Sequence, residues 1–255
     1  MAGRPEGGAS KRMQNFLLPY ASGPPGGGDE VSEAEIEILL LSAKVALAAM
    51  LFSIVPAFAV AWLLARGRFA GKALLQAVVT LPLVLPPVVT GYGLLVLFGS
   101  RGPLGRVLES FFDISFAFRW TGAALAAGVM AFPLLVRPIR LSLEAVDRGL
   151  EEAASTLGAW SPIVFLTVTL PLALPGLLAG IVLGFAKALG EFGATITFVS
   201  NVPGETQTLS LAIYALMQSP EGDAAALRLI GLSIILALGA VVVSEWVARR
   251  LERRA

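Results

Sequence analysis

The chain has 255 residues, of which 56% are hydrophobic and only 15% are charged, and its formal net charge is +1. Soluble domains average about 25% charged residues, so this composition excludes an ordinary soluble protein and favours one that lies in a membrane. The absence of Cys excludes disulfides and thiolate metal sites, and the absence of His removes the commonest general base, so we expect no covalent chemistry. The near-zero net charge gives no reason to expect a nucleic-acid partner.

The first 35 residues are mostly polar and rich in Gly, Pro and Ser, as in the run GPPGGG at 23–28. A segment of this composition buries too little apolar surface to fold, so we expect residues 1–35 to be a disordered tail outside the cell. The apolar run at 16–18 is far too short for the core of a signal peptide. Residues 36–250 then form one membrane domain.

Five apolar stretches are long enough to cross a bilayer, which takes about 20 mostly apolar residues. They cover residues 36–64, 73–98, 121–141, 172–199 and 224–247. We therefore predict an all-α, polytopic membrane protein with five transmembrane helices. Pro82, Pro86 and Pro87 interrupt the second stretch, and since proline breaks the backbone hydrogen-bond ladder, we expect a kinked span there.

The fourth stretch is ambiguous, because residues 161–199 are apolar enough to hold two spans. Pro162, Pro171 and Pro175 divide its first half into pieces that are too short to cross a membrane. We expect a short helix on the membrane surface, followed by a single span.

Basic residues indicate how the spans are oriented, since Lys and Arg collect in cytoplasmic loops. They gather at the ends of the first, third and fifth spans, whereas residues 200–226 contain none. This asymmetry predicts an N-terminus outside the cell and a cytoplasmic C-terminus. The residues concerned are Arg66, Arg68, Lys72, Arg137, Arg140, Arg148, Arg249, Arg250, Arg253 and Arg254.

An amphipathic helix is predicted on the cytoplasmic side between the third and fourth spans. Its apolar face comprises Leu143, Val146, Leu150, Ala153, Ala154 and Leu157. Helices that merely lie on a membrane carry Lys and Arg beside bulky apolar residues, whereas this polar face is net acidic and its centre is small, so docking to another protein is favoured. Gly158 suits a left-handed turn at the helix end, and Ser161 before Pro162 indicates the cap of a second helix.

The spacing within this region carries a family resemblance. Glu152-Ala153-Ala154 is followed by Gly158 and then by the run VTLP at 168–171. The pattern resembles the ATPase-docking motif of type I ABC importer permeases, with Val168 in place of the usual Ile as a mild departure. The resemblance implies that residues 142–171 form a cytoplasmic coupling region. It implies contact with an ATPase for Glu152, Ala153, Ala154, Gly158, Leu170 and Pro171.

Two further stretches narrow the resemblance to the permeases of molybdate importers. They are LPLVLPPVV at 81–89 and GEFGATITF at 190–198, the latter continuing through NVPGETQT at 201–208. The resemblance implies a permease subunit of the bacterial inner membrane that moves the oxyanion by alternating access. It also implies a homodimer, two cytoplasmic ATP-binding subunits and an external oxyanion-binding protein. ATP and magnesium would be bound by the partner ATPase, with no cofactor on this chain.

Other cargoes and other mechanisms stay open as alternatives. The same kind of permease could carry sulfate or tungstate. A secondary transporter driven by an ion gradient would need no docking helix and usually shows repeat symmetry, which is not evident here. An intramembrane enzyme is disfavoured by the absence of His and Cys and of a convincing acid pair.

Lys187 and Glu191 lie four residues apart on a predicted span, where a charge is costly. They could neutralise each other as a structural pair, or Lys187 could contact the oxyanion in the pathway. We expect Lys44 to extend towards the membrane surface, and Arg137 and Arg140 to anchor the end of the third span among the headgroups.

Overall fold

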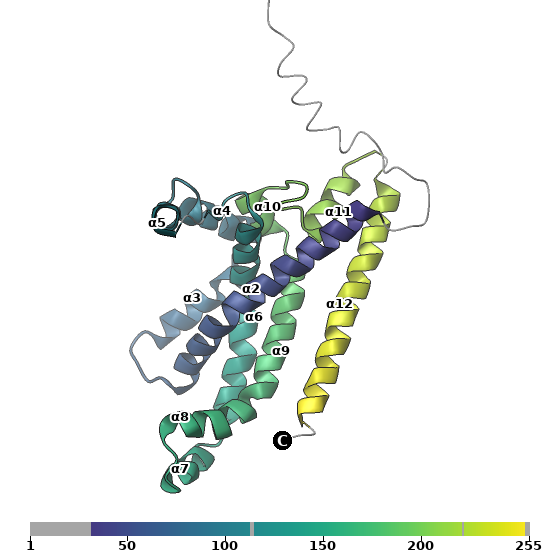
Figure 1. Cartoon of the computed structure of the whole chain (residues 1–255). Coiled ribbons are helices and arrows are strands. Elements are labelled where there is room, and N and C mark those ends of the chain that lie inside the picture. Colours follow the sequence, from purple (N-terminus) through teal and green to yellow (C-terminus); the bar gives the residue numbers. More distant parts are fainter. Residues whose placement is uncertain (1–31, 113–114, 221, 253–255) are drawn as a thin grey trace, which may run out of the picture.

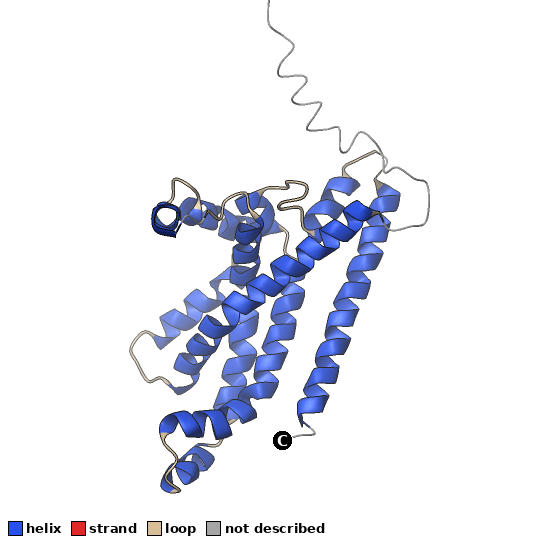
Figure 2. Cartoon of the chain, viewed as in Figure 1, coloured by secondary structure: helices blue, strands red, loops and turns tan. Residues whose placement is uncertain are grey.

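The secondary structure of the described part of the chain is helical, with loops and turns between the helices. The computed structural model describes residues 32–112, 115–220 and 222–252, and every regular element within them is a helix (Figure 2). The all-α prediction is therefore confirmed. Most of the predicted tail lies outside the described residues, as do Arg253 and Arg254 of the predicted cytoplasmic cluster.

The helices form an elongated bundle with two distinct ends (Figure 1). In the view of Figure 1, α7, α8 and the C-terminal end of α12 lie at the lower end, whereas α4, α5, α10, α11 and the start of α2 lie at the upper end. In chain order the helices are α2 (Glu33–Arg66), α3 (Lys72–Val84), α4 (Pro87–Phe98), α5 (Pro103–Phe112), α6 (Trp120–Ala145), α7 (Arg148–Thr156), α8 (Ser161–Val164), the π-helix η1 (Phe165–Thr169), α9 (Leu170–Leu189), α10 (Gly193–Val199), α11 (Leu209–Met217) and α12 (Asp223–Glu252).

Helix α2 begins earlier than predicted because a capping box starts it at Glu33. The Ser32 hydroxyl accepts the amide of Glu35, and the Glu35 carboxylate accepts the amide of Ser32. Glu35 also pairs with Arg228 of α12 at 3.2 Å, which ties the two helices together at this end. With 34 residues, α2 is about 50 Å long, more than the roughly 30 Å of a bilayer core. It runs obliquely across the bundle (Figure 1).

Helix α6 is the centre of the bundle, and α2 and α9 pack against it. Small residues on α9 allow this approach. A Cβ at Gly176 would lie 2.5 Å from the Pro138 carbonyl oxygen, and one at Gly180 would lie 3.0 Å from that of Leu135. Small residues four apart let membrane helices come close enough for van der Waals packing, which must hold them where lipid supplies no hydrophobic driving force.

The second predicted span is broken rather than kinked. Helices α3 and α4 meet at a bend of 113°, and with 13 and 12 residues each is too short to cross a core of about 30 Å alone. Leu85 and Pro86 have extended backbone at the break. A residue that precedes proline avoids the helical region, and two consecutive prolines impose this on both residues.

The fourth predicted span is displaced towards the N-terminus. No separate surface helix precedes it: one helix of 29 residues runs from Ser161 to Leu189, through the π-helix, and α10 follows as a separate short helix. The expectation that prolines divide this stretch is therefore wrong. Pro171 is the second residue after the π-helix, close to where the hydrogen-bond register changes, so its missing N–H is tolerated.

By length and composition, four helical stretches could cross a membrane, and the bent α3–α4 pair makes a fifth if it is counted as one broken span. The count of five predicted spans thus holds only with this pair included. The four stretches are Glu33–Arg66, Trp120–Ala145, Ser161–Leu189 and Asp223–Val242. Many large apolar side chains on them point outwards, as a lipid-facing surface requires.

The structure packs together the two stretches that resemble molybdate permeases. Helix α4, whose first three residues end the first stretch, lies against α10, which belongs to the second. A Cβ at Gly91 would lie 2.5 Å from the Ala194 carbonyl oxygen, and one at Gly193 would lie 2.7 Å from Pro87 Cβ. Backbone therefore touches backbone, and only glycine fits at the contact.

We expect Gly91→Ala to lower the free energy of unfolding by about 1–3 kcal/mol, because the added methyl group presses on Ala194 in a packed contact. The matched control is Gly93→Ala on the same helix, where a Cβ would meet nothing within 4 Å. It should leave the stability unchanged or raise it, since Ala favours helix over Gly. Thermal unfolding of the purified protein in detergent measures both. An unchanged melting temperature for Gly91→Ala would contradict the close α4–α10 contact.

Candidate coupling site

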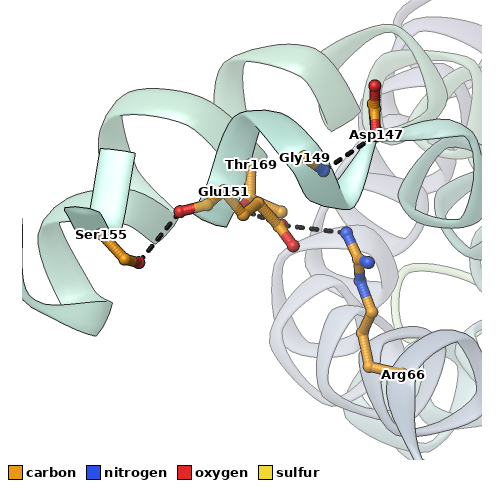
Figure 3. Close-up of polar contacts among 6 residues, drawn as sticks. All are labelled: Arg66, Asp147, Gly149, Glu151, Ser155 and Thr169. Carbon is orange, nitrogen blue, oxygen red and sulfur yellow. Dashed lines mark hydrogen bonds and ion pairs between the residues drawn. The ribbon is translucent and has the colours of Figure 1, made fainter. Parts of the chain in front are cut away.

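The helix predicted across residues 143–157 is in fact two helices. Helix α6 ends at Ala145, and α7 begins at Arg148 after two residues with extended backbone. The Asp147 carboxylate accepts the amide of Gly149 at 2.8 Å and so caps α7 (Figure 3). The prediction of one continuous helix is wrong because it followed the apolar spacing and passed over this Asp-Arg-Gly cap signal.

Gly158 adopts the left-handed turn predicted for it, with φ of +90°. Its amide donates to the Ser155 carbonyl at 3.0 Å, and the Ala159 amide donates to the Ala154 carbonyl at 3.2 Å. These bonds satisfy carbonyls at the end of α7, as in other glycine-terminated helices. A residue with a Cβ would be strained here although the surrounding space is open.

The second helix starts one residue away from its predicted position. Trp160, not Ser161, is the capping residue, and Ser161 already belongs to α8. The Trp160 carbonyl accepts the amides of Ile163 and Val164 at 2.8 and 3.1 Å. These are the amides that a capping Ser161 hydroxyl would have bound, so the prediction is wrong in register while the helix–turn–helix arrangement holds.

The predicted docking residues on α7 lie open on its surface. Glu152, Ala153 and Gly158 are exposed, and Ala154 is half-buried. Leu170 and Pro171 lie on a different helix, in the first turn of α9, so the motif is divided between two elements. Large apolar side chains are exposed beside the α7 residues, with Leu157 89% exposed. We call the coupling surface the set Leu150, Glu152, Ala153, Leu157, Gly158 and Trp160.

Glu151, which the sequence did not single out, holds α7 against the bundle (Figure 3). Its Oε1 atom accepts a hydrogen bond from Arg66 Nη2 at 2.9 Å and another from Thr169 Oγ1 at 2.6 Å. Arg66 is the last residue of α2, and Thr169 is the last residue of η1. One carboxylate oxygen therefore joins three helices. A shallow pocket of about 670 Å³ adjoins it, lined by Trp62, Arg66, Arg148, Glu151, Glu152, Ser155 and Thr156.

Lys187 and Glu191 form an ion pair near the opposite end of α9. Lys187 Nζ lies 2.5 Å from Glu191 Oε2, and the other carboxylate oxygen accepts the Ala194 amide at 3.0 Å. Glu191 is almost fully buried, with 1% of its side chain exposed, whereas Lys187 is 30% exposed. The geometry fits the structural interpretation, and a contact of Lys187 with the oxyanion stays a prediction.

Two other charged side chains make contacts that the sequence did not predict. Lys44 is exposed, and its Nζ lies 3.8 Å from the centre of the ring of Trp120, the first residue of α6, so it makes a cation–π contact there. Its extension to the membrane surface stays a prediction. Arg140 donates to Gln76 of α3 at 2.5 Å and to Glu144 at 2.7 Å, so it joins α3 to α6. Its anchoring among the headgroups stays a prediction. Arg137 is exposed.

Comparisons with known proteins identify the class of transport protein to which this chain belongs. Residues 57–255 match the family described as the binding-protein-dependent transport system inner membrane component. The chain belongs to this family of multi-pass inner membrane proteins. Its fold is that of type I ABC importer permeases. A chain of a bacterial ABC transporter involved in the import of the acidic polysaccharide alginate superposes with a TM-score of 0.69, at 16% identity, covering 95% of this chain and 90% of that chain.

Other known proteins share much more of their sequence with this chain than the alginate transporter chain does. The chain is 56% identical over 225 residues to the molybdenum transport system permease protein ModB of Escherichia coli, covering 88% of this chain and 98% of the relative. It is 38% identical over 206 residues to the sulfate transport system permease protein CysT of Salmonella typhimurium, covering 80% of this chain and 73% of the relative.

We expect Lys187→Met to reduce the amount of folded permease more than Glu191→Gln does. The first change leaves a buried carboxylate without its cation, and breaking a buried pair in this way costs about 3–5 kcal/mol. The second leaves a neutral amide that can still accept the Ala194 amide, and Lys187 can reach solvent. The double variant carries no charge and should recover part of the loss. Size-exclusion chromatography of each variant in detergent measures the folded amount.

Uptake per folded complex separates this outcome from a substrate contact. If Lys187 binds the oxyanion, Lys187→Met folds normally, and transport is lost in the single and the double variant alike. A double variant that folds worse than either single variant would contradict the structural pairing.

Proposed function

We propose that this chain is the permease subunit of an ATP-driven molybdate importer. The observation that carries the proposal is the contact between α4 and α10, because it joins the two stretches of sequence that resemble molybdate permeases. The similarity to the molybdenum permease of Escherichia coli over nearly its whole length supports the same cargo. Sulfate is the second candidate, since a sulfate permease is also similar, at a lower identity of 38%.

The coupling surface supports a cytoplasmic ATPase as the partner. It presents exposed apolar side chains next to an exposed Glu152, on a helix that is held to the bundle by its other face. An apolar patch with a charged rim is typical of a protein–protein interface. ATP and magnesium are then bound on the separate ATPase chain, no cofactor is held by this chain, and this chain supplies the pathway.

A complete importer would contain two copies of this chain, two ATPase subunits and an external binding protein that delivers the oxyanion. The matched family is described as binding-protein-dependent, which supports the external binding protein. Alternating access follows if closure of the ATPases moves the two copies of the coupling surface together. The substrate is a dianion that must also be released, so weak contacts along the pathway suffice.

The two ends of the bundle support the proposed orientation. Helix α7 and the C-terminal end of α12 lie at one end, and the start of α2 lies at the other (Figure 1). An ATPase on α7 places that end in the cytoplasm. The N-terminus is then outside and the C-terminus inside, as the distribution of basic residues predicts.

Transport by the reconstituted complex tests the cargo. We expect liposomes that contain this permease with its ATPase and binding protein to take up molybdate and tungstate only when ATP is present on the ATPase side. Sulfate uptake should be roughly tenfold slower, a difference of about 1.4 kcal/mol. Faster uptake of sulfate than of molybdate would contradict the proposal that molybdate is the cargo. Uptake that needs an ion gradient but no ATPase would contradict the proposal that the transporter is driven by ATP.

Cysteine labelling tests the orientation, and the absence of native Cys makes single introduced probes unambiguous. A membrane-impermeant maleimide added to intact cells should label Ser219→Cys and Ser22→Cys. Gly71→Cys, Ser155→Cys and Ala255→Cys should react only after the membrane is opened. Labelling of Ser155→Cys from outside would contradict the proposed side of the coupling surface.

A further inference from the structure

Two adjacent glutamates on α7 have opposite surroundings. Glu151 faces the bundle with 21% of its side chain exposed, and its Oε1 atom receives hydrogen bonds from Arg66 and Thr169 (Figure 3). Glu152 is exposed and belongs to the coupling surface. Successive residues on a helix point about 100° apart, so one can serve the interior of the permease while the next serves a partner.

The partners of Glu151 are themselves enclosed. Thr169 is 1% exposed, and the side chain of Arg66 is 14% exposed. Arg66 Nε is buried without a hydrogen-bond partner in the described part of the chain. The Glu151 carboxylate compensates the charge of this guanidinium through Nη2, and this charge-assisted hydrogen bond holds α7 against α2.

Aromatic packing makes the same junction rigid by an independent contact. Phe165, at the start of η1, packs edge-on against Phe58 at 5.8 Å and Trp62 at 5.3 Å, both on α2. The C-terminal part of α2 and the π-helix thus contact each other through aromatic side chains, and both also bind the Glu151 carboxylate. A π-helix within an α-helix often marks a functional site, and this one ends at the residue that binds Glu151.

We propose that Glu151 is a positioning residue for coupling: it fixes α7 to α2 and to the start of α9, so that movement of the docked ATPase reaches both spans. This inference rests on the proposed ATPase partner. In this arrangement Glu152 contributes to holding the ATPase, and Glu151 contributes to passing its movement on.

The test compares four variants in the complete transporter reconstituted in liposomes. Glu151→Ala removes the junction, Glu151→Gln keeps an acceptor oxygen without the charge, and Thr169→Val removes one donor at almost unchanged shape. Glu144→Ala is the matched control, since it breaks an ion pair of 2.7 Å at the same end of the molecule, but one that joins two residues of α6. The quantities measured are the ATPase that co-purifies, the ATP hydrolysis stimulated by loaded binding protein, and the molybdate taken up per ATP.

We expect Glu151→Ala to retain its ATPase and to hydrolyse ATP while uptake per ATP falls roughly fivefold or more, the lower range for coupling between sites. Glu151→Gln should recover part of this ratio, Thr169→Val should show a smaller loss, and Glu144→Ala should keep the ratio of the unchanged protein. Glu152→Ala should instead reduce the amount of ATPase that co-purifies.

Each other result decides against the proposal. A Glu151→Ala ratio equal to that of Glu144→Ala overturns it, as does a loss of complex with an unchanged ratio, which indicates a merely structural role. If Glu151→Ala does not fold, then an unchanged molybdate uptake per ATP in Thr169→Val would also overturn the proposal. Failure of the unchanged permease to bind any ATPase would instead overturn the proposed function.

Discussion

The need to satisfy every backbone N–H and C=O group inside a membrane shapes this protein more than any other constraint. It restricts the described chain to helices, so every departure from helical backbone requires a local partner. At Asp147 that partner is a carboxylate, which accepts the Gly149 amide. At the break after α9 it is Glu191, which accepts the Ala194 amide. At these two places a charged side chain lies where the backbone is interrupted, and the same side chain helps to connect one helix to the next.

Packing in the bundle depends on residues that occupy little space. Helix α9 approaches α6 along its glycines, and α4 approaches α10 at Gly91 and Gly193. Lipid is as apolar as a leucine side chain, so close fit rather than avoidance of water selects these contacts. Helices packed this closely transmit a displacement from one to the next, because no space is left between their backbones.

Local signals in the sequence were enough to predict several of these features. Gly158 was predicted in a left-handed turn because that conformation depends on a single residue, and the long apolar stretches were predicted as helices because their length is set by the bilayer. The residue at which each helix begins was harder to predict, because Ser161 and Asp147 are both residue types that cap helices. In the structure Asp147 accepts the Gly149 amide, whereas Ser161 lies inside α8. The junction at Glu151 could not be predicted, because Arg66 lies 85 residues away in sequence. The one available signal was the adjacent pair of glutamates at the start of the motif.

The same contacts define a route from the coupling surface to the middle of the protein. A displacement of α7 would act on Glu151 and so on two helices at once, α2 through Arg66 and α9 through Thr169. The far end of α2 is held to α12 by the pair of Glu35 and Arg228, so α2 is better suited to pivot than to translate. Helix α9 leads instead to the buried carboxylate of Glu191, which holds the start of α10. Because α10 touches α4 backbone to backbone, a shift of α9 cannot leave α4 in place. Movement that begins at the proposed ATPase contact would therefore arrive at the two stretches whose sequence points to the cargo.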